Sequence, residues 1–328
     1  MGSVETIRSQ LQIWFRSSVF AVLLTVFLLL ITAFLNPWIL APASWAILLG
    51  TFAPFAIAAM ASTPAIVSGG GGIDISIGPL MALIGIVFVK VLLPNGLGAP
   101  WISIPIMLAM GAAVGMFNGI VIAQFRYPPV ITTMSVNFVL TGISLAVAPI
   151  PIAAIPNWTS QLAHWIGPIP GSLLTIGLPI LIWVGLKKTA FNRTLFAVGA
   201  DDATAFSAGI DVVRTRIVAY GLGGLFAGIG AIALTALLQS ADATQGGQYT
   251  LLAIAAVALG GTTLNGGRGT LRGAVFGAAA IFLLQDVLTA LDVPSTRLRS
   301  AYGAALLAGV IVGARAIMRR SRSSEAHG

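Results

Sequence analysis

The chain has 328 residues, of which 57% are hydrophobic and only 8% are charged, whereas about a quarter of the residues in a soluble domain are charged. This composition, with a mean hydropathy of +0.99, predicts an integral membrane protein, and one helical bundle can use the whole length. The lack of cysteine excludes disulfides, thiolate metal sites and a cysteine nucleophile.

Apolar stretches of helical length predict an all-α membrane protein with about ten transmembrane helices. They lie at residues 17–35, 45–67, 77–93, 102–125, 130–148, 172–187, 217–238, 251–260, 270–290 and 301–316. The first could be a signal peptide, because residues 41–43 loosely resemble a cleavage site, but its length favours an uncleaved helix. The eighth is short and runs into glycines, so it either extends upstream or is a broken helix.

The basic residues follow this topology rather than forming a nucleic-acid surface. With the N-terminus inside, fourteen of the seventeen lysines and arginines fall in cytoplasmic segments and three outside, which is a strong positive-inside bias. Both termini are then cytoplasmic. We expect a cytoplasmic segment at 1–16, one transmembrane domain at 17–316, and a disordered cytoplasmic tail at 317–328. Segment 149–171, with Trp158 and Trp165, is expected to form an external cap anchored by aromatic side chains.

A glycine-rich stretch, GGGGIDISIG, runs from Gly69 to Gly78. Four consecutive glycines between apolar runs break the helical path and allow close backbone approach. No Gly-Lys-Ser/Thr follows, so the stretch is not a phosphate loop. Asp74 and Ser76 are expected to cap the next helix, although Asp74 could instead line a polar cavity.

Polar side chains on the apolar helices are candidates for lining a passage. Thr133, Asn137 and Thr141 are spaced four apart and form one stripe, and Asn118 lies on the preceding helix. Such groups can face a hydroxylated solute or simply hydrogen-bond a neighbouring helix.

A second glycine-rich stretch, Gly260 to Gly273, loosely echoes the first and suggests a weak internal repeat. About a dozen residues into the helix that follows it lie Gln285 and Asp286. An ionisable group at that depth indicates a functional site, with a cap near the external helix end as the alternative.

A polar island interrupts the apolar sequence from Lys187 to Arg216. Within it, Asp201 is placed to cap a short helix that Gly209 ends. A helix this short needs a partner surface to be stable, so the island is either a docking element or an ordinary connector.

Together these motifs resemble the permease subunits of ribose-type ABC sugar importers, which include ribose, xylose, galactose and autoinducer-2 systems. The resemblance covers residues 45–316 and rests on four motifs in order: GGIDISIG, FNGIVIAQFRYPPVITT, AVGADDATAFSAGID and AIAAVALGGTTLNGGRGT. It implies a type II-like permease fold, broken at the glycine-rich stretches, in a bacterial inner membrane. It also implies a second permease subunit, a cytoplasmic ATPase that binds ATP and Mg, and a periplasmic or lipid-anchored binding protein.

In that family, the loop matching Ala197 to Ile210 presses a short helix onto the ATPase. Carried over to this chain, the docking residues are Val198, Gly199, Asp201, Asp202, Ala205, Phe206 and Gly209. From the residues themselves we expect the passage to be lined by Asp74, Ser76, Asn118, Thr133, Asn137, Gln285 and Asp286. No cofactor, metal or nucleic acid is expected on this chain.

The chain also departs from the family pattern. Thr250 to Leu252 stand where relatives carry an acidic residue, Gln285 and Asp286 replace two asparagines, and Ala203 and Phe206 replace charged residues. The solute therefore stays open between sugars or polyols and nucleosides or branched-chain amino acids. A proton-coupled secondary transporter using Asp74 or Asp286 is the alternative of another class. An intramembrane enzyme has no support, because the helices carry no set of serine, histidine and acid.

Overall fold

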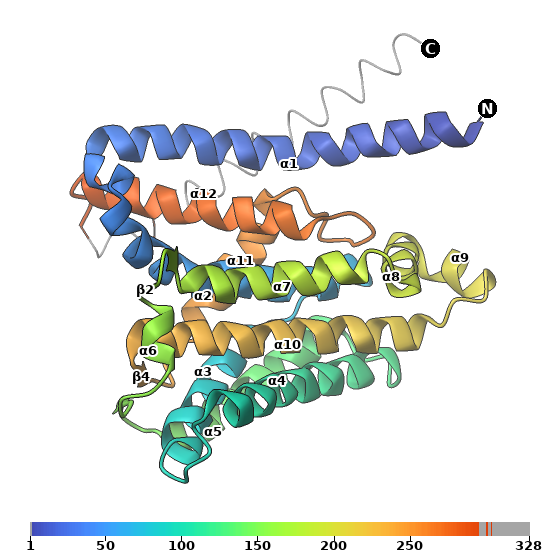
Figure 1. Cartoon of the computed structure of the whole chain (residues 1–328). Coiled ribbons are helices and arrows are strands. Elements are labelled where there is room, and N and C mark those ends of the chain that lie inside the picture. Colours follow the sequence, from blue (N-terminus) through green and yellow to red (C-terminus); the bar gives the residue numbers. More distant parts are fainter. Residues whose placement is uncertain (1, 295–299, 301–302, 304–328) are drawn as a thin grey trace.

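The computed structural model describes residues 2–294, 300 and 303, and for residues 2–18 it describes the backbone alone. The described chain is mostly helical, and its main helices run side by side (Figure 1). They are α1 (Gly2–Leu35), α2 (Trp45–Val67), α3 (Ile77–Val87), α4 (Pro100–Ala123), α5 (Pro129–Val147), α7 (Ser172–Leu186), α10 (Val212–Leu238), α11 (Gly247–Leu259) and α12 (Leu271–Ala290).

Nine of the predicted apolar stretches coincide with these helices, and the tenth, at 301–316, lies outside the described residues together with the tail. Among the described helices, five are long and apolar enough to cross a bilayer, and α7 with α8 (Ala190–Ala200) makes a sixth if this pair, bent by 89°, is one span. The eighth stretch does extend upstream, because α11 begins at Gly247. The chain is thus a multi-helix membrane protein, while the count of ten crossings stays a prediction.

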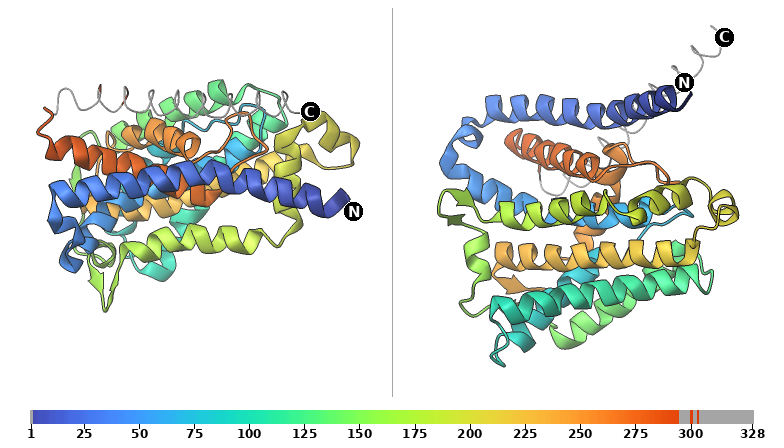
Figure 2. Two further views of the ribbon diagram at one scale, coloured as in Figure 1. Left: turned by 90° about the horizontal axis from the view of Figure 1, so that it is seen from above. Right: turned by 45° about the vertical axis from the view of Figure 1, so that its right-hand side comes forward.

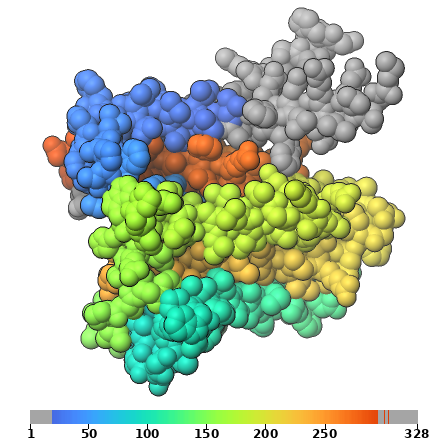
Figure 3. Space-filling model, viewed as in Figure 1, coloured from blue at the N-terminus to red at the C-terminus, as the bar shows by residue number. Residues whose placement is uncertain are grey.

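Short elements gather at the two ends of the bundle. At one end, α6 (Thr159–Leu162) lies near two small antiparallel pairs, β1 (Ile152–Ala153) with β4 (Ser240–Ala241) and β2 (Trp165–Ile166) with β3 (Ile169–Pro170). At the other end lie α8 and α9 (Asp202–Ser207) (Figures 1 and 3), together with the start of α1 (Figure 1). The polar island and the N-terminal end of α1 therefore share one end of the molecule, opposite segment 149–171.

The cap segment is fastened to the bundle through one of its two tryptophans. Trp158 donates from Nε1 to the carbonyl of Gly98 at 2.9 Å, and its ring meets that of Phe88 edge-on, with centroids 6.0 Å apart. Trp165 is 41% exposed. Trp158 thus contacts protein, and anchoring at the membrane interface stays a prediction for the exposed Trp165.

The first helix lies along α12, as the right-hand view of Figure 2 shows. The Thr25 hydroxyl donates to the carbonyl of Phe276 in α12 at 2.9 Å. This contact joins helices far apart in the sequence, and the uncleaved first helix stays a prediction.

Helix α10 is the centre of the packing, with α4 on one side and α2 on another. Its side chains Tyr220 and Phe226 are fully buried. The α4 contact depends on small residues: a Cβ atom built on Gly224 would lie 2.1 Å from the carbonyl oxygen of Gly111, and one on Gly115 would lie 2.2 Å from that of Tyr220. Apolar helices in a membrane associate through such close backbone contact.

This contact predicts the effect of a single methyl group. Gly224→Ala is expected to destabilise the protein by about 1–3 kcal/mol, the usual cost of overpacking, because α4 and α10 must move apart. Gly177→Ala is the matched control: it also lies in a helix, but its Cβ would meet no atom within 4 Å, so it should be neutral or slightly stabilising. Thermal unfolding of the detergent-solubilised protein measures both, and equal stability of the two variants would contradict the packing described here.

Candidate functional site

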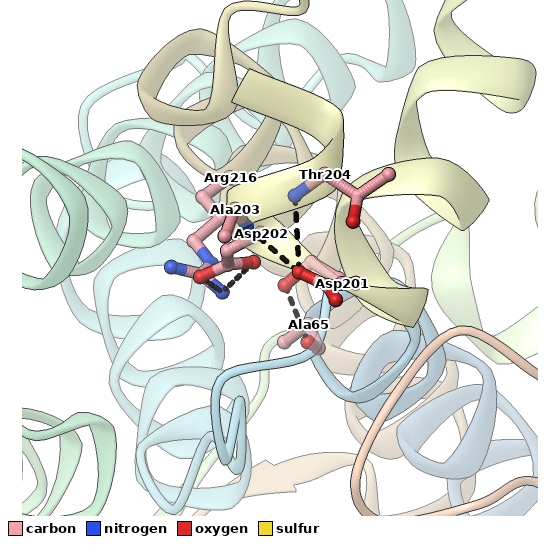
Figure 4. Close-up of polar contacts among 7 residues, drawn as sticks. Ala65, Asp201, Asp202, Ala203, Thr204 and Arg216 are labelled. Carbon is pink, nitrogen blue, oxygen red and sulfur yellow. Dashed lines mark hydrogen bonds and ion pairs between the residues drawn. The ribbon is translucent and has the colours of Figure 1, made fainter. Parts of the chain in front are cut away.

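The polar island folds into two helices that turn away from the bundle. Helix α9 begins after Asp201, whose carboxylate accepts hydrogen bonds from the backbone N–H groups of Ala203 at 2.9 Å and Thr204 at 3.1 Å (Figure 4). The Thr204 and Ala203 N–H groups hold the pKa of the Asp201 carboxyl below its usual range. Gly209, at φ +79°, follows the helix and donates to the carbonyl of Phe206. The predicted short helix, capped by Asp201 and ended by Gly209, is confirmed.

Six of the seven predicted docking residues divide into an exposed and a buried group, and the seventh, Asp202, is half-buried. Phe206 is 74% exposed, and Asp201 and Gly209 are also exposed. Val198, Gly199 and Ala205 are buried against this chain. In this conformation a partner can touch the first group, whereas the second group holds the loop in place.

The chain between α2 and α3, residues 68–76, is a helix break. Gly69, Gly70 and Gly71 all have positive φ, at +76°, +62° and +72°, a conformation that strongly favours glycine. Ser68, at the end of α2, donates from its hydroxyl to the carbonyl of Ala65 at 2.6 Å. The predicted break at the first glycine-rich stretch is therefore present.

Three segments far apart in sequence meet at this break, and we call their contact the glycine junction: Gly69, Gly199, Gly266 and Gly267. A Cβ on Gly69 would lie 2.8 Å from the Cα of Gly199, and one on Gly266 would lie 2.2 Å from the Cα of Gly69. The N–H of Gly267 also donates to the carbonyl of Val67 at 3.0 Å. The two echoing glycine stretches thus touch each other and the base of the polar island.

Next to the junction lies an ion pair between α9 and α10. Arg216 donates from Nη2 to both carboxylate oxygens of Asp202, at 2.7 Å each (Figure 4). The Arg216 side chain is 14% exposed and that of Asp202 is 45% exposed. Sequence reasoning placed Asp202 in the docking loop but did not identify this partner, because fourteen residues separate the two.

A buried polar network lies at the start of α3. Ser76 donates from its N–H and its hydroxyl to Oδ1 of Asp74, at 2.9 and 2.6 Å, and Asn118 of α4 donates to the Ser76 hydroxyl at 2.9 Å. All three residues are at most 3% exposed. Oδ1 of Asn118 and the hydroxyl of Tyr220 are buried and have no hydrogen-bond partner among the described residues. The prediction that Ser76 caps α3 is wrong, because its side chain makes no cap bond to the helix and instead joins Asp74 to Asn118. Asp74 accepts from the N–H of Ser76, the residue before α3, and so bonds within its own turn.

Thr133 fastens the break to α5. Its hydroxyl shares one proton between the carbonyls of Pro129 and Ile73, at 3.0 and 3.1 Å, and accepts from the N–H of Ile75 at 3.2 Å. Asn137, one turn further, is half-buried and accepts from Thr141 at 3.2 Å. The predicted polar stripe thus begins with a residue that satisfies the backbone of the break.

Gln285 and Asp286 occupy another part of the bundle. Both are half-buried near the C-terminal end of α12, a helix that packs against α1, α2 and α11. Neither side chain has a hydrogen bond or ion pair within the described ranges, and the structure does not join them to the network at Asp74. No group of three or more histidine, aspartate or glutamate side chains that could hold a metal ion occurs among residues 2–294.

Known proteins resemble this chain over most of its length. The family model described as "Branched-chain amino acid transport system / permease component" matches residues 44–315. The ribose import permease of Bacillus subtilis strain 168 is 33% identical over 274 residues, covering 82% of this chain and 84% of that protein. The ribose import permease of Escherichia coli K12 is 34% identical over 235 residues (68% and 71%). The autoinducer 2 import permease of Photorhabdus laumondii is 33% identical over 267 residues (78% of each).

No solved structure matches the chain. The family match nevertheless includes all the segments that form the glycine junction, the docking helix and the buried polar network. The resemblance noted from the four sequence motifs is confirmed, and the chain belongs to this family of transport-system permease components.

Proposed function

We propose that the chain is the permease subunit of an ATP-binding-cassette importer that carries a sugar or polyol across the membrane. The ribose and autoinducer 2 import permeases among its relatives support this solute class. The observation that carries the proposal is α9, a six-residue helix with a capped N-terminus that projects from one end of the bundle and exposes a phenylalanine.

The proposal assigns the energy source to other subunits. The chain has no phosphate-binding Gly-Lys-Ser/Thr motif, so ATP and Mg would bind a cytoplasmic ATPase that touches α9. A second permease subunit would complete the passage, and a periplasmic or lipid-anchored binding protein would deliver the solute to the end that carries β1 to β4. The positive-inside bias supports a bacterial inner membrane with α9 on the cytoplasmic side.

In this arrangement Phe206 makes the main contact with the ATPase. It stands where relatives often carry a charged residue, so the facing surface would be an apolar pocket rather than a charged one. Asp201 and Gly209 fix the two ends of α9 around it. The buried residues Val198, Gly199 and Ala205 would set the position of α9 without touching the partner.

The candidate passage residues take two roles in this proposal. Asn137, Gln285 and Asp286 are half-buried, so their side chains could meet a solute. Asp74, Ser76, Asn118 and Thr133 are buried and would hold the break between α2 and α3, from which they could reach the passage only when the break moves.

The family description favours a second candidate solute, a branched-chain amino acid. Competition between ribose and leucine during uptake separates the two candidate solutes. A proton-driven carrier would instead take up solute without ATP.

We expect reconstituted vesicles holding the permease, its ATPase and its binding protein to accumulate radiolabelled ribose only when ATP is supplied.

Asp286→Asn is expected to lower uptake about tenfold or more, as loss of one buried polar solute contact can. Thr289→Ala is the control, because this exposed hydroxyl bonds only the carbonyl of Gln285 in its own helix. Uptake of leucine in place of ribose would support the second candidate, and uptake driven by a proton gradient without ATP would contradict the proposal.

Phe206→Ala is expected to weaken binding of the ATPase on the order of tenfold, because an aromatic side chain at an interface often contributes more than 1 kcal/mol. The variant should fold normally, since the side chain contacts solvent. Phe34→Ala is the matched control: that ring is 85% exposed at the opposite end of the bundle. Co-purification with the tagged ATPase measures both variants. Undiminished recovery with Phe206→Ala would remove α9 as the docking site.

A further inference from the structure

Arg216 touches two parts of the molecule at once. Its Nη2 atom contacts both oxygens of Asp202, the first residue of α9, at 2.7 Å. The same guanidinium lies against the backbone of Gly70 in the break: a Cβ on Gly70 would lie 2.4 Å from Nη2 and 2.9 Å from Cζ. A single side chain therefore spans from the docking helix to the break between α2 and α3.

We propose that Arg216, held by Asp202 and seated on Gly70, is a positioning residue that passes movement of α9 to the helix break and so couples ATP hydrolysis to transport. This inference rests on the proposed function. It adds a role for Arg216 that neither the docking motif nor the candidate passage includes.

The ion pair and the glycine junction connect the break between α2 and α3 to different parts of the docking loop. The junction joins the break to Gly199, before α9 begins, through backbone contacts. Asp202 lies after the cap residue, so its carboxylate is fixed to α9 itself. The ion pair therefore fixes α9 at a second point, in addition to the buried side chain of Ala205.

Movement of the break would reach the candidate passage through contacts already described. Thr133 holds the backbone at Ile73 and Ile75, and Ser76 holds both Asp74 and Asn118. Further along, the N–H of Gly78 donates to the Thr250 hydroxyl of α11 at 3.2 Å, which fastens the start of α3 to α11. A shift at Gly70 is therefore passed to α5, α4 and α11.

The chain contains its own comparison for this ion pair. Arg214 and Asp211 are 3.7 Å apart, with side chains 86% and 56% exposed, and both lie at the start of α10. An exposed pair at this distance contributes little. Arg216 is instead 14% exposed and makes two short contacts to another helix. These contacts hold Arg216 and α9 together, so that a movement of α9 would move Arg216 as well.

The experiment measures uptake per ATP hydrolysed in vesicles that hold the complete complex with its binding protein. Arg216→Gln is expected to keep ATPase co-purification and basal ATP hydrolysis, while solute uptake per ATP falls on the order of tenfold. Arg214→Gln should match the wild type. The exchanged pair Asp202→Arg with Arg216→Asp is expected to recover part of the coupling, because the ion pair can re-form.

A role in folding alone would lower assembly, hydrolysis and uptake together, and that result with Arg216→Gln would overturn the inference. An unchanged ratio of uptake to hydrolysis in Arg216→Gln would also overturn it. Failure of the wild-type complex to hydrolyse ATP or to transport would instead defeat the proposed function. The two failures are therefore distinguishable.

Discussion

Gly69, Gly199 and Gly266 bring three backbones so close together that a methyl group on any of them would overlap a neighbouring main chain. Only glycine permits this approach, and two of the three positions also require positive φ. The contact fixes the start of the helix break, the base of the docking loop and the turn before α12 relative to one another. The docking loop and the helix break therefore take their relative positions from this junction.

A helix break inside an apolar bundle must satisfy its backbone groups with protein, because lipid offers no hydrogen bonds. In residues 68–76, the N–H of Gly72 donates to the carbonyl of Gly69, and the N–H of Ser76 donates to the carboxylate of Asp74. The hydroxyl of Thr133, from α5, bonds the carbonyl of Ile73 and the N–H of Ile75. The polar side chains near the break are therefore tied to its structure. Any movement that opens a passage here has to exchange these bonds for others, which makes two discrete arrangements more plausible than a continuous deformation.

The sequence was sufficient for the features that depend on local chemistry. Apolar stretches of bilayer length marked nine helices, Asp201 and Gly209 marked the ends of α9, and four glycines marked the break. Each of these rests on residues within about one or two helical turns of one another. The family resemblance followed from the order of four such motifs.

The sequence patterns could not predict the tertiary contacts. The periodicity of Thr133, Asn137 and Thr141 indicates a shared helix face, but not that Thr133 meets the backbone of the break. The docking motif names Gly199 and Ala205 without showing that both are buried. The partner of Asp202 could not be inferred either, since several arginines near the island are equally basic and only the fold selects Arg216. Paired glycine stretches suggested a repeat, whereas their physical contact required the structure.

The central claim is that the end of the bundle carrying α9 faces the cytoplasm, where an ATPase can press on it. Because the chain contains no cysteine, single cysteines introduced at Ser207, exposed on α9, and at Ile155, 54% exposed in the opposite cap, can be labelled without background. A maleimide that cannot cross membranes should modify Ser207→Cys only in inside-out vesicles and Ile155→Cys only from the outer face of intact cells. Labelling of Ser207→Cys from outside would contradict the account.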